Sequence, residues 1–155
     1  MVLESMLSKE TVKLGISCVD KWTVIGNLID LMVEKGRVRD REAILSAVIN
    51  REKQGSTGLE KGVAIPHARS DGVRELVAAL GISKDGLDFD SVDAKPCHLI
   101  FLIVAPPQES TRYLKALAAI VSYIAKDEDV ISRLRLAASP EEVMSILAEI
   151  GKSIP

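Results

Sequence analysis

The segment HLIFLIVAPP, residues 98–107, decides the fold more directly than any other part of the sequence. Its apolar run from Leu99 to Ala105 has no polar residue at alternate positions, which is typical of a strand buried on both faces. Pro106 and Pro107 end the strand, because proline has no backbone N–H with which to continue a β-ladder. We therefore expect a buried strand with helices packed against both of its faces.

Shorter apolar segments and two amphipathic helices precede this strand. VAIPHA (63–68) and LVAALGIS (76–83) are expected strands, and a further short strand is possible near TVKLGI (11–16). One helix is expected over 20–36, with Asp20 as its N-cap and Gly36 at its left-handed end, and a second opens at Asp40 and runs to residue 54. The side chains at helical spacing that we expect to face the core are Trp22, Ile25, Leu28, Ile29 and Met32 in the first helix, and Ile44, Ala47 and Val48 in the second.

Three helices are expected after the long strand. The first carries an apolar stripe, the second begins near Asp127, and the third opens with Ser139 as N-cap, Pro140 at the first helical position and Glu142 closing a capping box. The stripe of the first consists of Leu114, Leu117, Ala118, Val121 and Ile124. Helices interleaved with buried strands predict an α/β fold with a central sheet, whose strand order and directions these patterns leave open. No repeat or linker divides the chain, so one domain over 1–155 is expected.

Composition excludes several classes of function. The net charge of −2, with 27% charged residues, does not suit a protein whose main partner is nucleic acid, because phosphate backbones attract a basic excess. The apolar run of residues 99–105 is too short to span a bilayer, and the N-terminus lacks the pattern of a signal peptide. A cytoplasmic protein is therefore expected, with Cys18 and Cys97 as reduced thiols and with no metal site.

The segment REKQGSTGLEKGVAIPHAR, residues 51–69, carries the candidate chemistry. Pro66 suits a strand end, so His67 is expected where a strand opens into a cleft. A neutral imidazole, with an ordinary pKa of about 6.5, can accept a phosphoryl group on nitrogen and release it again. The glycine-rich loop, with Ser56 and Thr57, and the guanidinium of Arg51 could bind that anion. Each feature has a structural alternative, namely a packed histidine, an ordinary turn and a buried ion pair, and the loop lacks the Gly-Lys-Ser/Thr ending of a P-loop.

This segment closely resembles the active-site signature of the fructose/mannitol-type EIIA domains of the bacterial phosphotransferase system, a group that includes the nitrogen-regulatory EIIA proteins. The matching residues are Arg51, Glu52, Ser56, Thr57, Gly58, Gly62, Ala64, Pro66 and His67. The segments GLDFDSVDAKPCHLIFLIVAP (86–106) and YLKALAAIVSYIAKDEDVISRLRLAASPEEVMSIL (113–147) resemble the later strand and the closing helices of that family. The resemblance implies a central mixed sheet flanked by helices on both faces.

The resemblance also implies a mechanism. Phosphorylated HPr would transfer its phosphoryl group to Nε2 of His67, and the group would pass to a cysteine of an EIIB partner or remain as a regulatory mark. By the same resemblance Arg51 stabilises the phosphoryl charge, and Thr57 helps to orient the imidazole or the phosphate. Ser56 and Gly58 belong with Thr57 to the phosphate-binding loop, and no metal or organic cofactor is needed.

One position departs from the family pattern. Family members often carry a second histidine, in a His-Leu pair, where this chain has Tyr113–Leu114. The Tyr113 hydroxyl could donate to a phosphoryl oxygen, or the ring could only pack over the cleft mouth. His98, at the start of the long strand, is interpreted as structural.

Two classes of function remain for comparison. The first is a phosphocarrier, serving either sugar uptake or nitrogen-type regulation, with a slight preference for regulation because the second histidine is missing. The second is an EIIA-like interaction module that is not phosphorylated, which the tyrosine at position 113 favours. A hydrolase with His67 as its base has little support, since no serine or cysteine nucleophile has a matching acid.

Overall fold

The computed structural model describes residues 2–17 and 20–154 and is built around one mixed β-sheet. Its central strand, β5 (Cys97–Ala105), pairs antiparallel with β4 (Val77–Leu87) and parallel with both β2 (Val63–Ala64) and β3 (His67–Arg69). The short strand β1 (Val12–Lys13) lies parallel to β4, on the side away from β5. The sequence-based prediction of a central mixed sheet is confirmed, and every residue of β5 except the half-buried His98 is buried.

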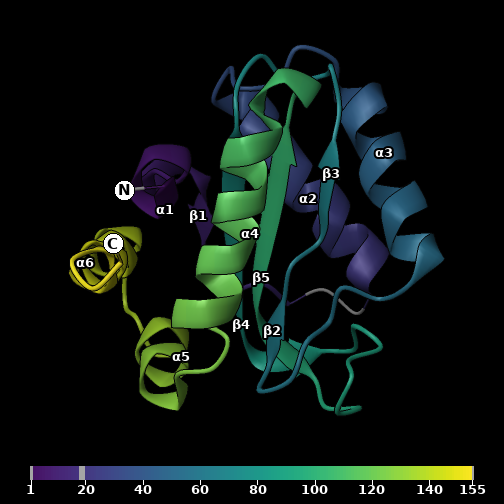
Figure 1. Ribbon diagram of the computed structural model, residues 1–155. Helices are drawn as coiled ribbons and strands as arrows, with labels where there is room; N and C mark the ends of the chain where they lie inside the picture. The colour runs from purple at the N-terminus through teal and green to yellow at the C-terminus, as the bar shows by residue number, and fades with distance from the viewer. Residues whose placement is uncertain (1, 18–19, 155) are drawn as a thin grey trace.

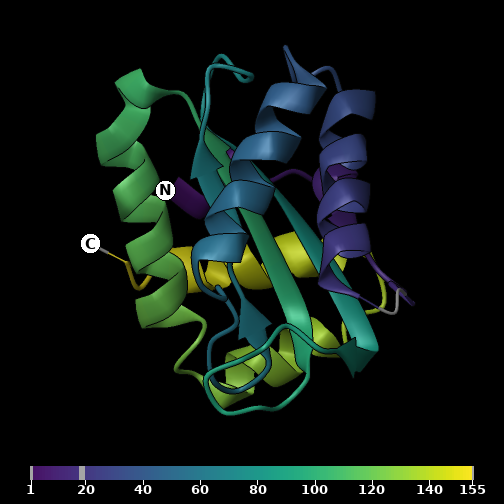
Figure 2. The same ribbon diagram turned by 90° about the vertical axis from the view of Figure 1, so that its right-hand side faces the viewer.

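Helices cover both faces of the sheet, as Figures 1 and 2 show. One face packs against α2 (Lys21–Glu34) and α3 (Arg41–Gln54). The other packs against α1 (Val2–Met6), α4 (Ser110–Tyr123), α5 (Glu128–Arg135) and α6 (Pro140–Gly151), with the short 3₁₀ turns η1 (Lys9–Thr11) and η2 (Pro107–Glu109). Side chains of β5 alternate between the two apolar clusters, since successive residues of a strand point to opposite faces. Leu99, Phe101 and Ile103 enter the α4 side, and Ile100, Leu102 and Val104 enter the α2 side.

Most of the predicted helix ends are confirmed. The carboxylate of Asp20 accepts the backbone N–H of Thr23 at 2.8 Å, and Asp40 and Asp127 cap α3 and α5 in the same way. Gly36 follows α2 with φ +69°. The capping box predicted for α6 is incomplete, because the Glu142 carboxylate accepts the N–H of Ala138 rather than that of the N-cap residue, Ser139.

Two predicted inward faces were wrong in part, although Ile25, Leu28, Ile29 and Met32 of α2 are buried as expected. Trp22 is 40% exposed, because its neighbour Lys21 takes the buried position in the first turn of α2. In α4 the buried side chains include Tyr113, Ala116 and Ile120, whereas Leu114 is 60% exposed. The exposed part of the predicted stripe is Leu114, Ala118 and Val121, while Leu117 is partly buried and Ile124 is buried as expected. Helix α4 is therefore rotated by about one residue from the predicted orientation.

The described chain contains a single cysteine, Cys97, which is a buried free thiol beside the Ser91 hydroxyl; Cys18 lies outside the described residues. No helix of the described part of the chain is both long enough and apolar enough to cross a membrane.

Candidate functional site

The candidate site is an open hollow of about 440 Å³ between α3, β3 and α4. His67 is the first residue of β3, and Pro66 separates β3 from β2, so the predicted strand is divided at the proline. The register of β3 against β5 places His67 opposite Ile103. The residues that line the hollow are Ala47, Asn50, Arg51, Gln54, His67, Ala68, Arg69, Tyr113, Leu114 and Leu117.

The imidazole of His67 is oriented by its own backbone. Its Nδ1 lies 2.6 Å from the carbonyl oxygen of Ile65. A carbonyl oxygen can only accept, so Nδ1 carries the proton and the lone pair of the neutral ring is on Nε2. The half-buried ring, which lines the hollow, therefore has Nε2 as the nitrogen that could act as a nucleophile.

Several groups act on the pKa of His67, and the net effect lowers it below 6.5. Burial has the largest effect and disfavours the charged ring. The hydrogen bond to Ile65 opposes this effect, the Arg51 guanidinium lowers the pKa further, and the Glu52 carboxylate raises it. Neutral, nucleophilic imidazole is thus the prevailing form of His67 at neutral pH.

Two guanidinium groups line the hollow. Arg51 is held at the end of α3, where its Nη1 donates to the carbonyl oxygen of Gly55 at 2.8 Å. Arg69 donates from Nη1 to the Ser110 hydroxyl at 3.1 Å. Arg69 was not among the residues predicted from the sequence, although the period of two along a strand could have placed it on the same face of β3 as His67. Together they make the hollow suitable for an anion.

Tyr113 is buried next to the histidine. The two ring centroids are 6.0 Å apart and their planes are inclined by 56°. The guanidinium of Arg69 lies 5.8 Å from the tyrosine ring centroid. Burial raises the pKa of Tyr113 to about 12, so the hydroxyl is neutral and keeps its proton. Tyr113 thus packs beside His67 and lines the hollow, while donation from its hydroxyl to a phosphoryl oxygen stays a prediction.

The predicted phosphate loop has other partners in this structure. The Ser56 hydroxyl donates to the carbonyl oxygen of Phe89 and accepts the N–H of Gly58 at 3.0 Å. The Thr57 hydroxyl donates to the carboxylate of Glu52 at 2.5 Å, and both residues are buried. Ser56, Thr57 and Gly58 do not line the hollow, so direct contact with a phosphoryl group stays a prediction for them. Glu52 belongs to the motif, but no sequence signal indicated that it would be buried beneath the loop.

His98 has a different environment. Its Nδ1 lies 2.9 Å from the carbonyl oxygen of Ser83. A Cβ built on Gly62 would lie 3.1 Å from His98 Cδ2, and one on Gly86 would lie 2.9 Å from Cε1, so the ring sits between two glycine backbones. This close packing supports the structural interpretation of His98.

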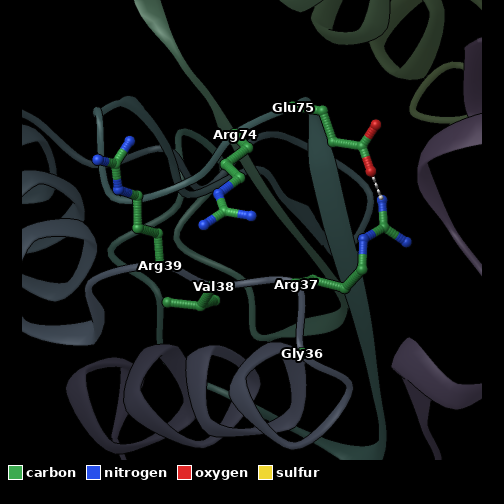
Figure 3. A pocket seen from close by; sticks show the side chains of 6 residues that line it. All are labelled: Gly36, Arg37, Val38, Arg39, Arg74 and Glu75. Atoms are coloured by element: carbon green, nitrogen blue, oxygen red, sulfur yellow. Dashed lines mark ion pairs between the residues drawn. The ribbon is translucent and has the colours of Figure 1, made fainter.

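Figure 3 shows a second hollow, of about 330 Å³, between the α2–α3 and β3–β4 connections. Arg37 forms an ion pair of 3.4 Å with Glu75 there, and Arg39 and Arg74 are also part of the lining. Its lining includes no histidine or cysteine, so it offers no nucleophile for phosphoryl transfer. Across residues 2–17 and 20–154, no group of three or more His, Cys, Asp or Glu side chains could hold a metal ion.

Residues 5–150 match the protein family described as the phosphoenolpyruvate-dependent sugar phosphotransferase system, EIIA 2. The chain belongs to this family. An imidazole with a free Nε2 beside two guanidinium groups agrees with that membership, and the predicted resemblance to fructose/mannitol-type and nitrogen-regulatory EIIA proteins is confirmed.

Two curated relatives illustrate the similarity of this EIIA domain. The fructose-specific EIIABC component of Bacillus subtilis is 35% identical over 152 residues, which are 98% of this chain but only 24% of that protein. The fructose-specific EIIA component of Haloferax volcanii is 41% identical over 123 residues, covering 79% of each chain. The chain thus spans about a quarter of the multidomain relative and most of the free-standing one.

Solved structures extend the comparison. The nitrogen regulatory protein IIA-Ntr of Neisseria meningitidis superposes with a TM-score of 0.83 at 27% identity, over 95% of this chain and 99% of that one. A complex of enzyme IIA mannitol with phosphorylated enzyme IIB mannitol, both from Escherichia coli, matches with a TM-score of 0.77 at 25% identity, over 92% of this chain and 97% of that one. The mixed-sheet fold of this EIIA domain is therefore the fold of both branches of the family.

Proposed function

We propose that this EIIA domain is a phosphocarrier in which Nε2 of His67 accepts a phosphoryl group from phosphorylated HPr. The group then passes to a cysteine of an EIIB protein, or remains on the histidine as a regulatory mark. The observation that carries the proposal is the hydrogen bond from Nδ1 to Ile65, which leaves the Nε2 lone pair free on a ring that lines an anion-compatible hollow.

The proposed transfer exchanges one phosphorus–nitrogen bond for another. The Nε2 lone pair of His67 attacks phosphorus, the bond from phosphorus to the donor's imidazole nitrogen breaks, and the donor keeps that electron pair. Nδ1 keeps its proton throughout, so the Ile65 carbonyl stabilises the positive charge that the phosphorylated ring acquires. Onward transfer reverses these events, with a cysteine thiolate as nucleophile and Nε2 as leaving group.

The chain contributes positioning and charge neutralisation to this transfer. Arg51 and Arg69 bring two positive charges to the hollow, and each is held by a hydrogen bond of its own. Such preorganised donors stabilise the negative charge of the phosphoryl group during transfer, because they do not need to rearrange. The neutral Tyr113 hydroxyl is a further donor for a phosphoryl oxygen.

The proposed partners differ in their support. An EIIB acceptor is supported by the similarity to the enzyme IIA mannitol of the complex with phosphorylated enzyme IIB mannitol. The proposal of HPr as the donor follows only from the resemblance of residues 51–69 to the active-site signature of the family. The proposal also includes a single EIIA domain over 1–155 that acts in the cytoplasm. Relatives carry names from both the sugar branch and the nitrogen-regulatory branch, so the proposal extends to either.

A test uses radiolabelled phosphoenolpyruvate with purified enzyme I and HPr. Wild-type protein should gain an acid-labile phosphoryl group, His67→Ala should gain none, and the matched histidine control His98→Gln should be labelled like the wild type. Labelling that persists in His67→Ala would rule out the assigned acceptor.

A second candidate function is an interaction module that is never phosphorylated, which the replacement of a second histidine by Tyr113 favours. Failure to label the wild type, in a reaction in which a known EIIA is labelled, would select this alternative.

A further inference from the structure

A buried charged group lies beneath the site, and the proposed function does not account for it. Lys21 at the start of α2 is 7% exposed, Glu52 in α3 is 3% exposed, and Thr57 in the following loop is 5% exposed. Charged side chains are seldom buried so completely, because removing them from water is costly. These residues come from α2, from α3 and from the loop that follows α3, and only the tertiary structure brings them together.

Their contacts form a single connected set. Lys21 Nζ lies 3.1 Å from Glu52 Oε2. The same oxygen accepts the backbone N–H of Thr57 at 2.9 Å, while Glu52 Oε1 accepts the Thr57 hydroxyl at 2.5 Å. With both oxygens occupied, the carboxylate holds the backbone and the side chain of Thr57 at once.

The set continues to the imidazole through the backbone. The carbonyl oxygen of Thr57 accepts the N–H of Ile65 at 3.1 Å, and the carbonyl oxygen of Ile65 accepts Nδ1–H of His67 at 2.6 Å. Pro66 lies between these last two residues and restricts the backbone of Ile65 to extended conformations. An unbroken series of contacts therefore links the ammonium group of Lys21 to the ring of His67.

The orientation of the Ile65 carbonyl decides which nitrogen of His67 has the lone pair. If this carbonyl turned away, nothing would favour the Nδ1–H tautomer, and a proton on Nε2 would block attack on phosphorus. Glu52 also follows Arg51 directly in α3, so fixing its carboxylate fixes the helical turn that carries the guanidinium. The buried carboxylate of Glu52 thus fixes two parts of the site, the Ile65 carbonyl and the turn of α3 that carries Arg51.

We propose that Lys21 and Glu52 are positioning residues for phosphoryl transfer, acting through Thr57 and Ile65 to keep His67 in the Nδ1–H tautomer. This inference rests on the proposed function for its catalytic consequence, but the tautomer itself is measurable in the unphosphorylated protein. Lys21 neutralises the buried carboxylate, and Glu52 holds the loop in place.

Paired variants test this chain of contacts. Thr57→Val keeps the shape of the side chain and removes only its hydroxyl, whereas Thr57→Ser retains a hydroxyl. Lys21→Met removes the buried cation, whereas Lys21→Arg retains a positive charge. Asp90→Asn is the control, since Asp90 contacts Lys21 Nζ at 3.0 Å, has a side chain that is 70% exposed, and makes no hydrogen bond to Thr57, Ile65 or His67.

The readout is the nitrogen NMR spectrum of protein labelled with ¹⁵N-histidine, recorded well above the pKa of His67, where shifts distinguish protonated from unprotonated ring nitrogens. The wild type should show Nδ1 protonated. Thr57→Val and Lys21→Met should shift population to the Nε2–H tautomer, while Thr57→Ser, Lys21→Arg and Asp90→Asn should resemble the wild type.

The transfer rate from phosphorylated HPr provides the second measurement. It should fall about tenfold or more in Thr57→Val and Lys21→Met, with the half-saturating HPr concentration unchanged, because positioning rather than docking is lost.

The outcomes are separable. If Thr57→Val and Lys21→Met lower the melting temperature but keep the wild-type tautomer and transfer rate, the residues are merely structural and the inference is wrong. If the wild type is not phosphorylated at all, the proposed function fails, while the tautomer measurement still decides whether these residues position the ring. If Lys21→Met does not fold, Thr57→Val decides alone, because a valine in the shape of threonine disturbs the packing least.

Discussion

Replacing Lys21 by methionine should destabilise the protein strongly, and the size of the effect follows from the burial of its two partners. The Lys21 ammonium lies 3.1 Å from Glu52 and 3.0 Å from Asp90. The side chain of Glu52 is 0% exposed and that of Asp90 is 70% exposed, so water screens the second pair but not the first. Removing one partner of a buried ion pair leaves an uncompensated charge, which costs about 3–5 kcal/mol. The exposed pair contributes about 0–1 kcal/mol, so Asp90→Asn should have little effect.

The double variant Lys21→Met/Glu52→Gln separates pairing from packing. It removes both charges while glutamine keeps an oxygen for Thr57, so it should be less destabilised than the sum of the single variants by about 1–3 kcal/mol. Against a typical total stability of about 5–15 kcal/mol, losses of this size are measurable by urea unfolding.

The pH of the measurement follows from the pKa of Lys21. Burial lowers this pKa, but the hydrogen bonds and charges of Asp90 and Glu52 raise it by more than burial lowers it, so that it lies above 10.5 in the folded protein. A raised lysine pKa contributes stability that is fully present below pH 10.5 and is lost as the pH rises through the folded value. Unfolding at neutral pH therefore measures the full contribution of the pair. A cost below about 1 kcal/mol for Lys21→Met, or strict additivity in the double variant, would refute the reasoning.

Three further predictions concern the site and its supports. Because burial lowers the pKa of His67 below 6.5, phosphoryl acceptance should stay high at neutral pH and decline as the pH falls through the lowered value. The unfolded state binds the proton first, so the free energy of unfolding should fall as the pH drops from 6.5 to the lowered value and should change no further through this residue. An NMR titration midpoint at or above 6.5 contradicts this prediction. Tyr113→Phe should change the free energy of unfolding by no more than about 0.5 kcal/mol, because the hydroxyl makes no hydrogen bond within the described chain. Tyr113→Ala should instead cost about 3–5 kcal/mol through the cavity it creates. Equal losses in the two variants would contradict the packing role. Gly62→Ala should lower the free energy of unfolding by about 1–3 kcal/mol, since φ of Gly62 is +82° and the new Cβ would lie 3.1 Å from His98. Gly26→Ala, at a helical position with open space, should be neutral or raise that free energy by up to about 1 kcal/mol. Thermal unfolding of the two variants provides the comparison.

Local signals in the sequence were sufficient for the framework of the fold. The apolar run at residues 99–105 predicted the central strand, because a strand covered on both faces has no need of alternating polar residues. The caps at Asp20, Asp40 and Asp127 predicted where helices begin, because a carboxylate acts on backbone N–H groups only two or three residues away. Family resemblance then placed His67 and Arg51 in one site, and the structure brings both to the same hollow.

The orientation of α4 was decided only by tertiary packing. This helix carries apolar residues on two adjacent stripes, one with Leu114 and Val121 and another with Tyr113 and Ile120. Periodicity cannot choose between two such stripes, since either would satisfy a helical pattern. Packing against β5 selects the second stripe, which buries Tyr113 beside His67 and leaves Leu114 at the rim of the hollow.

The sequence by itself indicated His67 as the candidate acceptor, the break in the strand at Pro66 and the starts of the capped helices, because each depends on residues close together in the chain. The tertiary structure alone decided the partners of Thr57 and the pairing of Lys21 with Glu52. That pair joins residues 31 positions apart, and no local pattern records it. Buried charges must be matched in space, so their partners are known only once the helices have packed together.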